Sequence, residues 1–376
     1  MKRIIVSLCV LILGMINLES NNSYAAEIQT EQEIVGVEAC EVSADILNFL
    51  QSIAKEVIID ILRDPSSMSI TRFSYDNIKI MEPYTVYCIK NGEFIKSEVY
   101  LFPVISNGNV LFNIAIYYFE GQLHYSVNNE LHSELTALIN NGNVGRVYYD
   151  YSNDCEQVST SIITQVDGVD LQPIKVLIDY SDEIYTSIVN RPELTISYPT
   201  NGFSLNTDTY KRLDMSYCLV LQNNTLCAMP CIATIYRYRT KTFEMTAESL
   251  TRLNNQEGYG FNVTTTAGQV ALINRIMPVV PECEYEEYWG VLTNYVVMHN
   301  INNAFPFIFG GSNGSGGHAF VLQGYQLNGN SMRWFYFNPW GDDNVTEYHT
   351  DGAVVSFYSK GYVWTEMQHS CLISPY

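Results

Sequence analysis

Basic residues are scarce in this 376-residue sequence: 20 Lys and Arg stand against 40 Asp and Glu, and the formal net charge is −20 at pH 7. A protein that tracks nucleic-acid phosphates needs basic side chains to displace counterions, so we expect no nucleic-acid partner. Charged residues make up only 16% of the chain, whereas hydrophobic residues make up 47%. An acidic disordered protein would be poor in apolar residues, and the composition therefore indicates a folded chain with a substantial core.

Long hydrophobic runs are also lacking. The longest, from Ile4 to Ile16, is shorter than the roughly 20 residues that a membrane-spanning helix needs. It follows the basic start Met1-Lys2-Arg3 and precedes the small residues of Ser23-Tyr24-Ala25. This order is typical of a secretory signal peptide. We therefore expect residues 1–25 to be a signal peptide, the protein to be secreted, and no stable membrane insertion.

Motifs for metals and nucleotides are missing as well. The chain has no Gly-rich phosphate-binding loop of the x-G-K-[ST] kind. Cys227-x3-Cys231 resembles half of a zinc site, but no second Cys/His pair follows at the spacing of a zinc finger. The nine cysteines are scattered, which does not indicate a dense disulfide scaffold. The sequence predicts neither a metal nor a cofactor.

The first part of the chain, residues 26–210, shows a mixed pattern of helices and strands. Apolar residues recur at helical spacing over 43–63, where Asp64-Pro65 ends the pattern. Apolar runs over 84–119 are separated by Asn-Gly pairs, which indicate hairpins. A helix over about 128–140 and further strands over 144–198 follow. The pattern predicts an N-terminal α+β module.

A polar segment over 199–212 indicates a boundary, and residues 211–376 have the length of one compact domain. Helices are predicted first, over about 227–239, 246–253, 266–277 and 286–298. Strands are predicted from residue 304 onward, in AFPFIFG, HAFVLQGY, RWFYFNPW and AVVSFY. Helices followed by antiparallel strands indicate an α+β domain.

Three residues of this second part could together form a catalytic site. Cys227 precedes Pro230, a residue tolerated only in the first turn of a helix, so its thiol lies where the helix dipole favours a thiolate. His318 follows the Gly-rich segment 314–317 at the start of a predicted strand, and Asn338 ends the next strand. An Asn oxygen can orient an imidazole toward a thiol. The order nucleophile, base and orienting residue predicts a catalytic triad.

The amide of Gln222, five residues before Cys227, could donate a hydrogen bond to the oxyanion of a tetrahedral intermediate. Trp340, two residues after Asn338, could shield the bond between Asn338 and His318 from water. The acidic pair Asp342-Asp343, which follows, is expected on a solvated face.

With these residues the sequence resembles the papain-like cysteine peptidases, above all the small secreted bacterial type (staphopain-like). The resemblance covers about 222–341 and places Gln222 on the oxyanion-hole residue, Cys227 on the nucleophile, His318 on the base and Asn338 on the orienting residue. It departs at the cysteine, where Leu226 and Ala228 replace the usual aromatic flank. A second alignment, to streptopain-like enzymes, puts the nucleophile at Cys231 instead. A Cys227–Cys231 disulfide, geometrically awkward at this spacing, would silence both thiols.

The resemblance implies a papain-like catalytic domain over 211–376, with a helical half and an antiparallel sheet half, and a pro-region over 26–210 that blocks the cleft intramolecularly. We therefore expect a secreted cysteine endopeptidase, made as a zymogen, that hydrolyses polypeptide substrates through an acyl-enzyme. Two alternatives stay open. One is another Cys–His acyl-transfer enzyme, such as a cell-wall amidase or a transglutaminase. The other is a non-enzymatic interaction protein with a decayed papain-like domain.

Overall fold

A computed structural model describes residues 33–90, 92–152, 157–164, 170–181, 183–190, 210–223, 225–256, 259–277 and 284–373. The expected signal peptide lies outside the described residues, and so do Cys155, Cys283 and most of the expected boundary segment.

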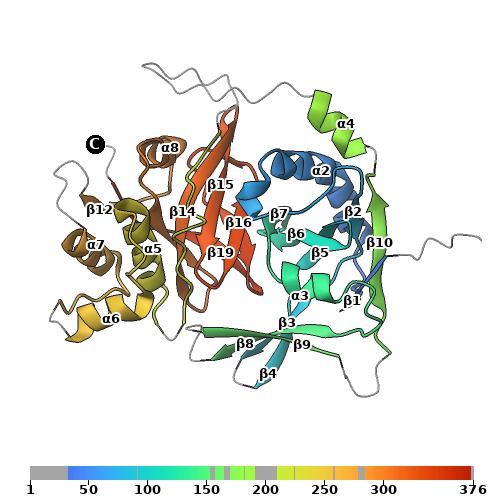
Figure 1. The fold of residues 1–376 in the computed structure, drawn as a ribbon, viewed down its shortest axis with the longest axis horizontal. Helices are drawn as coiled ribbons and strands as arrows, with labels where there is room; N and C mark the ends of the chain where they lie inside the picture. The colour runs from blue at the N-terminus through green and yellow to red at the C-terminus, as the bar shows by residue number, and fades with distance from the viewer. Residues whose placement is uncertain are drawn as a thin grey trace, which may run out of the picture. The chain divides into compact units, whose positions relative to one another are not determined.

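Most described strands belong to one 15-stranded sheet (Figure 1). These strands are β1 (Ile34–Glu38), β2 (Ile78–Met81), β5 (Tyr100–Ser106), β6 (Asn109–Phe119), β7 (Gln122–Asn128), β10 (Pro173–Asp179), β11 (Tyr210–Arg212), β12 (Tyr285–Trp289), β13 (Phe307–Ser312), β14 (Gly317–Asn328), β15 (Ser331–Asn338), β16 (Asp342–Thr346), β17 (His349–Thr350), β18 (Ser356–Ser359) and β19 (Tyr362–Ile373). Their order is β1-β10-β2-β5-β6-β7-β16-β15-β14-β13-β19-β12, with β11 paired to β14, β17 to β15 and β18 to β19. All these pairs are antiparallel.

A smaller sheet has the order β4-β3-β8-β9. Its strands are β3 (Val86–Lys90), β4 (Glu93–Lys96), β8 (Arg146–Ser152) and β9 (Gln157–Ile163). The helices are α2 (Ala44–Arg63), the 3-10 helix η1 (Pro65–Met68), α3 (His132–Ala137), α4 (Glu183–Asn190), α5 (Ala228–Thr240), α6 (Ala247–Gln256), α7 (Thr266–Ile276) and α8 (Asn294–Asn302). In Figure 1, α5, α6 and α7 gather at the end of the large sheet that holds β12, and α2 lies over β5, β6 and β7. None of the described helices combines the length and hydrophobicity of a membrane span.

The prediction of an α+β fold with a papain-like catalytic domain is wrong. Strand accounts for 41% of the structure and helix for 26%, and antiparallel sheet dominates to a degree that a papain-like fold does not reach. The reason is that strands from both parts of the chain join edge to edge. β7 pairs with β16, with Val127 opposite Val345. Local hydrophobic patterns identify strands, but they do not say which edges will pair.

This pairing joins the strands on both sides of the expected boundary near residue 210. Packing does the same, because Phe335 and Val345 belong to the apolar core that lies beneath α2. A second core contains Ala233 and Ile235 of α5 together with Phe309 and Phe320 of the sheet. The division into 26–210 and 211–376 stays a prediction about the sequence.

One predicted helix is partly a strand. The helix expected over 286–298 begins only at Asn294, after Thr293, whose side chain accepts a hydrogen bond from Val296 N–H. The residues before it form β12, in which Tyr285 lies opposite Ile373 of β19. Aromatic residues such as Tyr285 and Trp289 favour strands, and the pairing with β19 overrides the helical spacing.

Candidate active site

Cys227 lies where helix α5 begins. It is the residue before the first helical position, Ala228, and its own φ of −55° and ψ of −28° are already helical. Pro230 stands within the first turn, where its missing N–H costs no helical hydrogen bond. The side chain is half-buried. The thiol therefore occupies the positive end of a 13-residue helix, as the sequence predicts.

His318 is the second residue of β14, and Asn338 is the last residue of β15. The two strands are antiparallel neighbours. His318 Nε2 lies 2.9 Å from Asn338 Oδ1, and both side chains are buried. The structure thus brings together the expected base and its orienting residue across 20 positions of the chain.

Two further hydrogen bonds set the orientation of the Asn338 amide. The backbone N–H of Trp340 donates to Asn338 Oδ1 over 3.0 Å, and Asn338 Nδ2 donates to Ser359 Oγ over 2.7 Å. The amide oxygen therefore faces His318, so Nε2 carries the proton of the bond. In a neutral imidazole Nδ1 is then the proton acceptor.

Aromatic rings enclose the imidazole of His318. The ring of Trp340 stacks on it at a centroid distance of 4.0 Å and an interplanar angle of 29°. Phe320 meets it edge-on at 4.8 Å. Burial lowers the pKa of His318 to about 4, and the hydrogen bond with Asn338 opposes part of this shift. At neutral pH the imidazole is uncharged and can accept a proton.

Cys227 and His318 line the same pocket, which has a volume of about 340 Å³. Cys227 comes from α5 and His318 from β14. The walls mix apolar side chains, such as Met367 and Ile308, with polar ones such as Gln269. Acyl transfer by a cysteine requires a thiol, a neutral imidazole and space for the substrate.

Gln222 also lines this pocket. Its backbone N–H donates to the carbonyl of Pro339 over 2.7 Å, which ties the segment before α5 to the turn after Asn338. Its side-chain Nε2 donates to the carbonyl of Thr225 over 2.9 Å. The amide is therefore at the pocket, and one of its donors is held by a backbone oxygen.

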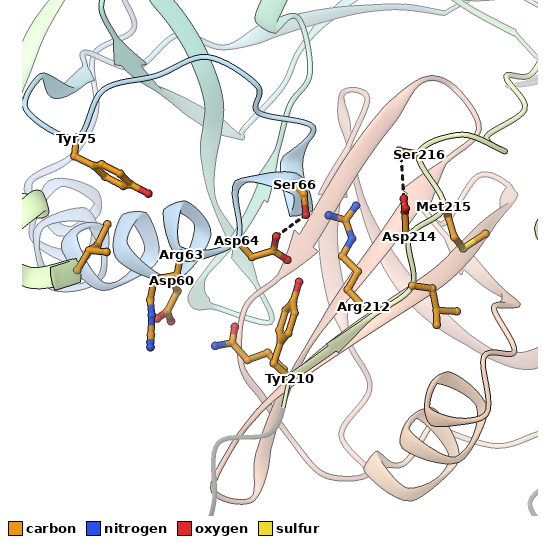
Figure 2. A pocket seen from close by; sticks show the side chains of 13 residues that line it. Asp60, Arg63, Asp64, Ser66, Tyr75, Tyr210, Arg212, Asp214, Met215 and Ser216 are labelled. Atoms are coloured by element: carbon orange, nitrogen blue, oxygen red, sulfur yellow. Dashed lines mark hydrogen bonds between the residues drawn. The ribbon is translucent and has the colours of Figure 1, made fainter. Parts of the chain in front are cut away.

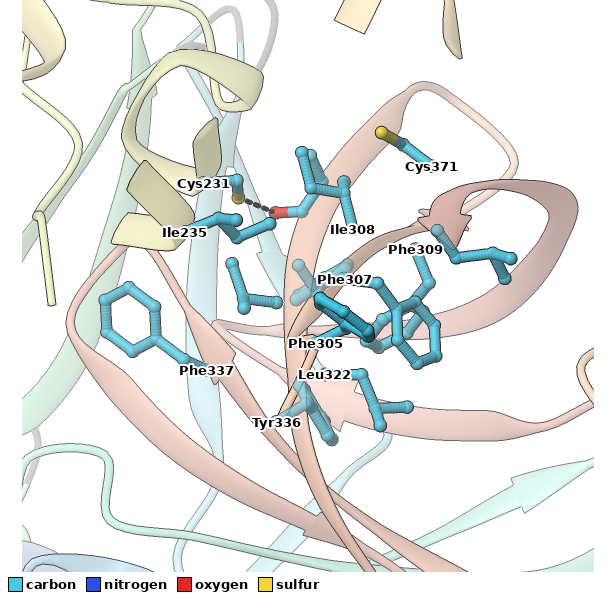
Figure 3. Packing of buried hydrophobic residues seen from close by; sticks show 14 of the residues in the cluster. Cys231, Ile235, Phe305, Phe307, Ile308, Phe309, Leu322, Tyr336, Phe337 and Cys371 are labelled. Atoms are coloured by element: carbon cyan, nitrogen blue, oxygen red, sulfur yellow. Dashed lines mark hydrogen bonds between the residues drawn. The ribbon is translucent and has the colours of Figure 1, made fainter. Parts of the chain in front are cut away.

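Cys231, the second candidate nucleophile, lies one turn further along α5. It is fully buried, and its Sγ lies 3.5 Å from the carbonyl oxygen of Ala319. Figure 3 shows it among apolar side chains that include Ile235 and Ile308. Burial raises the pKa of this thiol well above its usual value. Cys231 carries no disulfide and does not line the pocket, so its surroundings suit a core residue.

The structure corrects the expectation for the acidic pair. Asp342 and Asp343 are only 4% exposed rather than solvated. Asp342 lies opposite Asn338 in the register of β15 and β16, and its Oδ2 is 3.1 Å from Lys360 Nζ. Apolar strands on both sides enclose the pair, which local polarity does not reveal.

Three residues near the site escaped the sequence-based prediction. Ser359 bonds Asn338, and Met367 and His369 of β19 line the pocket. All three come from strands near the end of the chain, outside any motif, and only the long-range pairing of β19 with β13 brings β19 beside the pocket.

Another pocket, of about 830 Å³, lies elsewhere (Figure 2). It is lined by α2, η1 and β11 and carries side chains of both charges, including Asp64, Arg212 and Asp214. Its described lining contains neither cysteine nor histidine and so offers no Cys–His pair. The described residues also hold no cluster of three His, Cys, Asp or Glu that could bind a metal ion.

Comparison of the chain with models of known protein families gives no match, and comparison with curated proteins gives none either. The function therefore has to be inferred from the geometry of these residues.

Proposed function

We propose that this protein is a secreted cysteine endopeptidase that hydrolyses peptide bonds through an acyl-enzyme on Cys227. The observation that supports it most is the 2.9 Å contact between His318 Nε2 and Asn338 Oδ1 at a pocket that Cys227 shares. The fold gives no support, because its sheet content departs from that of papain-like enzymes. The proposal rests on the site alone.

The proposed reaction begins with transfer of the Cys227 thiol proton to His318 Nδ1. The sulfur then attacks the carbonyl carbon of the peptide bond, and the carbonyl oxygen becomes an oxyanion. The backbone N–H of Cys227 and the side-chain amide of Gln222, once it turns from Thr225, donate hydrogen bonds to that oxygen. The C–N bond breaks as His318 protonates the leaving amine. His318 then takes a proton from water, which attacks the thioester and releases the acid and the thiol.

Substitution of the two neighbouring cysteines tests the proposal. Cys227→Ala should abolish both hydrolysis of an unfolded protein substrate and labelling by a thiol-directed inhibitor, with an unchanged circular dichroism spectrum. Cys231→Ala is the matched control on the same helix. It should retain labelling and hydrolysis but unfold at a lower denaturant concentration, because it leaves a cavity in the core.

Other outcomes separate the alternatives. If Cys227→Ala keeps both activities while Cys231→Ala loses them, the nucleophile is misassigned. Release of cell-wall peptides without cleavage of proteins would favour an amidase. A wild-type protein that reacts with no thiol-directed inhibitor at neutral pH would be an interaction protein rather than an enzyme.

A further inference from the structure

A buried cluster of charges lies behind the candidate site. Glu130 is fully buried, and Lys360 and Asp342 are 8% and 4% exposed. Glu130 belongs to the first part of the chain, while Asp342 and Lys360 belong to the second. The carboxylate of Glu130 accepts hydrogen bonds from the backbone N–H of Lys360 and from the hydroxyl of Tyr149, the latter over 3.0 Å. Burying a carboxylate is costly unless donors satisfy it, and Glu130 has these two donors, while the ammonium of Lys360 pairs with Asp342 over 3.1 Å.

Glu130 is connected to Asn338 through one side chain, Ser359. Burial raises the pKa of Glu130, and Lys360, Tyr149 and Ser359 oppose this shift, so the hydroxyl of Ser359 favours the ionised carboxylate. The same Oγ accepts the 2.7 Å bond from Asn338 Nδ2. Because Ser359 Oγ accepts from Asn338, its own proton is left to donate, and the carboxylate of Glu130 is an acceptor that this hydroxyl stabilises. This order turns the oxygen of the Asn338 amide toward His318.

We propose that Glu130 is a positioning residue of the active site and that residues of the N-terminal module stay part of the working enzyme. The inference rests on the proposed function and departs from the expectation that 26–210 is a removable pro-region. Glu130 acts through Ser359 and Asn338 and touches no reacting atom. The Trp340 N–H bond to Asn338 Oδ1 gives the amide a second, independent support, so loss of Glu130 weakens the orientation without abolishing it.

Further contacts tie this part of the chain to the strands behind the site. Asn129 Oδ1 accepts from Asp343 N–H over 3.0 Å, and Ser126 Oγ accepts from Tyr358 N–H over 3.1 Å. These bonds flank the β7–β16 pairing. Removal of the module would leave buried donors without partners and expose the edge of β16.

The lining of the pocket agrees with retention of the module. Every described residue that lines it lies in the range from Gln222 to His369. In the described residues, the module therefore contacts the site from behind, through Glu130, and contributes no wall to the pocket. No described residue of the module therefore has to be removed to give a substrate access to Cys227.

Kinetics of three variants in the full secreted chain test the role of Glu130. Glu130→Gln and Ser359→Ala should each lower kcat roughly 10-fold with little change in KM, the loss expected for one hydrogen bond to a charged group. Ser359→Ala leaves the Lys360 and Tyr149 bonds of Glu130 intact, so it covers the case in which Glu130→Gln fails to fold. The double variant should lose no more than either single variant, because both break one chain of bonds.

Glu347→Gln is the matched control, since Glu347 is a largely buried carboxylate that contacts His124 and the backbone N–H of Tyr125 but not Asn338. It should leave kcat unchanged. An unchanged kcat in Ser359→Ala, or losses that multiply in the double variant, would overturn the role of Glu130 while leaving the proposed function intact. A wild-type chain without activity or labelling would overturn both.

The mass of the labelled enzyme tests whether the N-terminal module is retained. Secreted wild-type protein, treated with a thiol-directed covalent inhibitor, should carry the label on a species that includes Glu130 in one native complex. Active, labelled protein from which the residues around Glu130 have been lost, with kcat at least as high as that of the intact chain, would refute the inference and restore the pro-region. Because hydrolysis persists in that outcome, it is distinct from failure of the proposed function.

Discussion

The side chains of His318 and Asn338 meet at a distance of 2.9 Å, although 20 positions of the chain separate them. The contact is buried, and the indole of Trp340 stacks on the imidazole. Because the amide oxygen of Asn338 receives the Nε2–H, the geometry leaves Nδ1 as the basic nitrogen. In the proposed mechanism, the direction of this bond decides which nitrogen takes the proton of Cys227.

Loss of the amide should therefore reduce catalysis without unfolding the chain. Asn338→Ala removes the acceptor that selects the tautomer and orientation of His318. We expect kcat to fall roughly 10- to 100-fold, because His318 is charged once it has taken a proton, and a hydrogen bond to a charged group contributes about 1.5–3 kcal/mol. Steady-state kinetics on a peptide substrate measure this decrease in kcat.

Asn300→Ala is the control for this substitution. Asn300 is another fully buried Asn, and its amide donates to the carbonyls of Val296 and Ile373. Its replacement should lower the denaturation midpoint and leave kcat near the wild-type value. Equal loss of kcat in both variants would mean that Asn338 has only a structural role.

The candidate site was more predictable from sequence than the fold. Asn338 and Trp340 belong to one short motif, and the bond between Asn338 Oδ1 and Trp340 N–H spans two residues. Cys227 could be placed because Pro230 restricts where a helix begins. By contrast, the pairing of β7 with β16 brings together residues more than 200 positions apart. No local pattern encodes such a pairing, so the α+β prediction failed and Ser359 and Glu130 were not foreseen.

The pH dependence of kcat/KM should reveal the buried imidazole. Burial lowers the pKa of His318 to about 4, so the base is already deprotonated across the neutral range. We expect kcat/KM to fall only as the pH approaches 4, where protonation of His318 removes the base. An acid limb that falls near pH 6.5, the usual value for histidine, would contradict the burial of His318 in the working enzyme.

Replacement of Trp340 by Ala should shift the acid limb of the pH profile of kcat/KM. The variant removes the ring that stacks on His318 at 4.0 Å and admits water to the imidazole. Hydration favours the charged form, so the pKa of His318 should rise and the acid limb should shift to higher pH. Trp340→Phe, which keeps an aromatic face, should shift it less. Identical profiles for the three proteins would show that Trp340 does not shield the base.

A methyl group added at Gly317 should obstruct the substrate rather than the fold. Gly317 lines the pocket, and a Cβ built on it would meet only Met367 Sδ, at 3.5 Å, and the carbonyl of Gly311, at 3.9 Å. These are ordinary contacts, so Gly317→Ala should fold with an unchanged melting temperature. We expect kcat/KM to fall roughly 10- to 100-fold, because a substrate displaced by about 1 Å reacts poorly.

Gly316→Ala provides the comparison at the next position. A Cβ there meets nothing within 4 Å, and Gly316 does not line the pocket. Its kcat/KM should stay near the wild-type value. If Gly317→Ala is as active as Gly316→Ala, the substrate does not pass over the start of β14.

The stability of the protein should depend on pH through Glu366. This carboxylate is 5% exposed and accepts hydrogen bonds from Leu292 N–H, over 2.8 Å, and from Val355 N–H, over 3.2 Å. Burial raises its pKa from 4.5 to about 7, and the two hydrogen bonds only partly oppose the shift. A pKa raised by folding means that the folded chain binds the proton more tightly. The stability that this proton contributes is complete below pH 4.5 and is lost as the pH rises through 7.

Glu366→Gln removes this dependence because the amide does not titrate. We expect the variant to be less stable than wild type at pH 5, where it loses one acceptor. As the pH rises from 5 to 8, its free energy of unfolding should increase relative to that of wild type by up to about 3 kcal/mol. Urea denaturation at the two pH values measures the difference. Glu286→Gln, an exposed change on neighbouring β12, should leave the wild-type trend intact. A constant gap between wild type and Glu366→Gln at both pH values would mean that Glu366 stays ionised in its buried position.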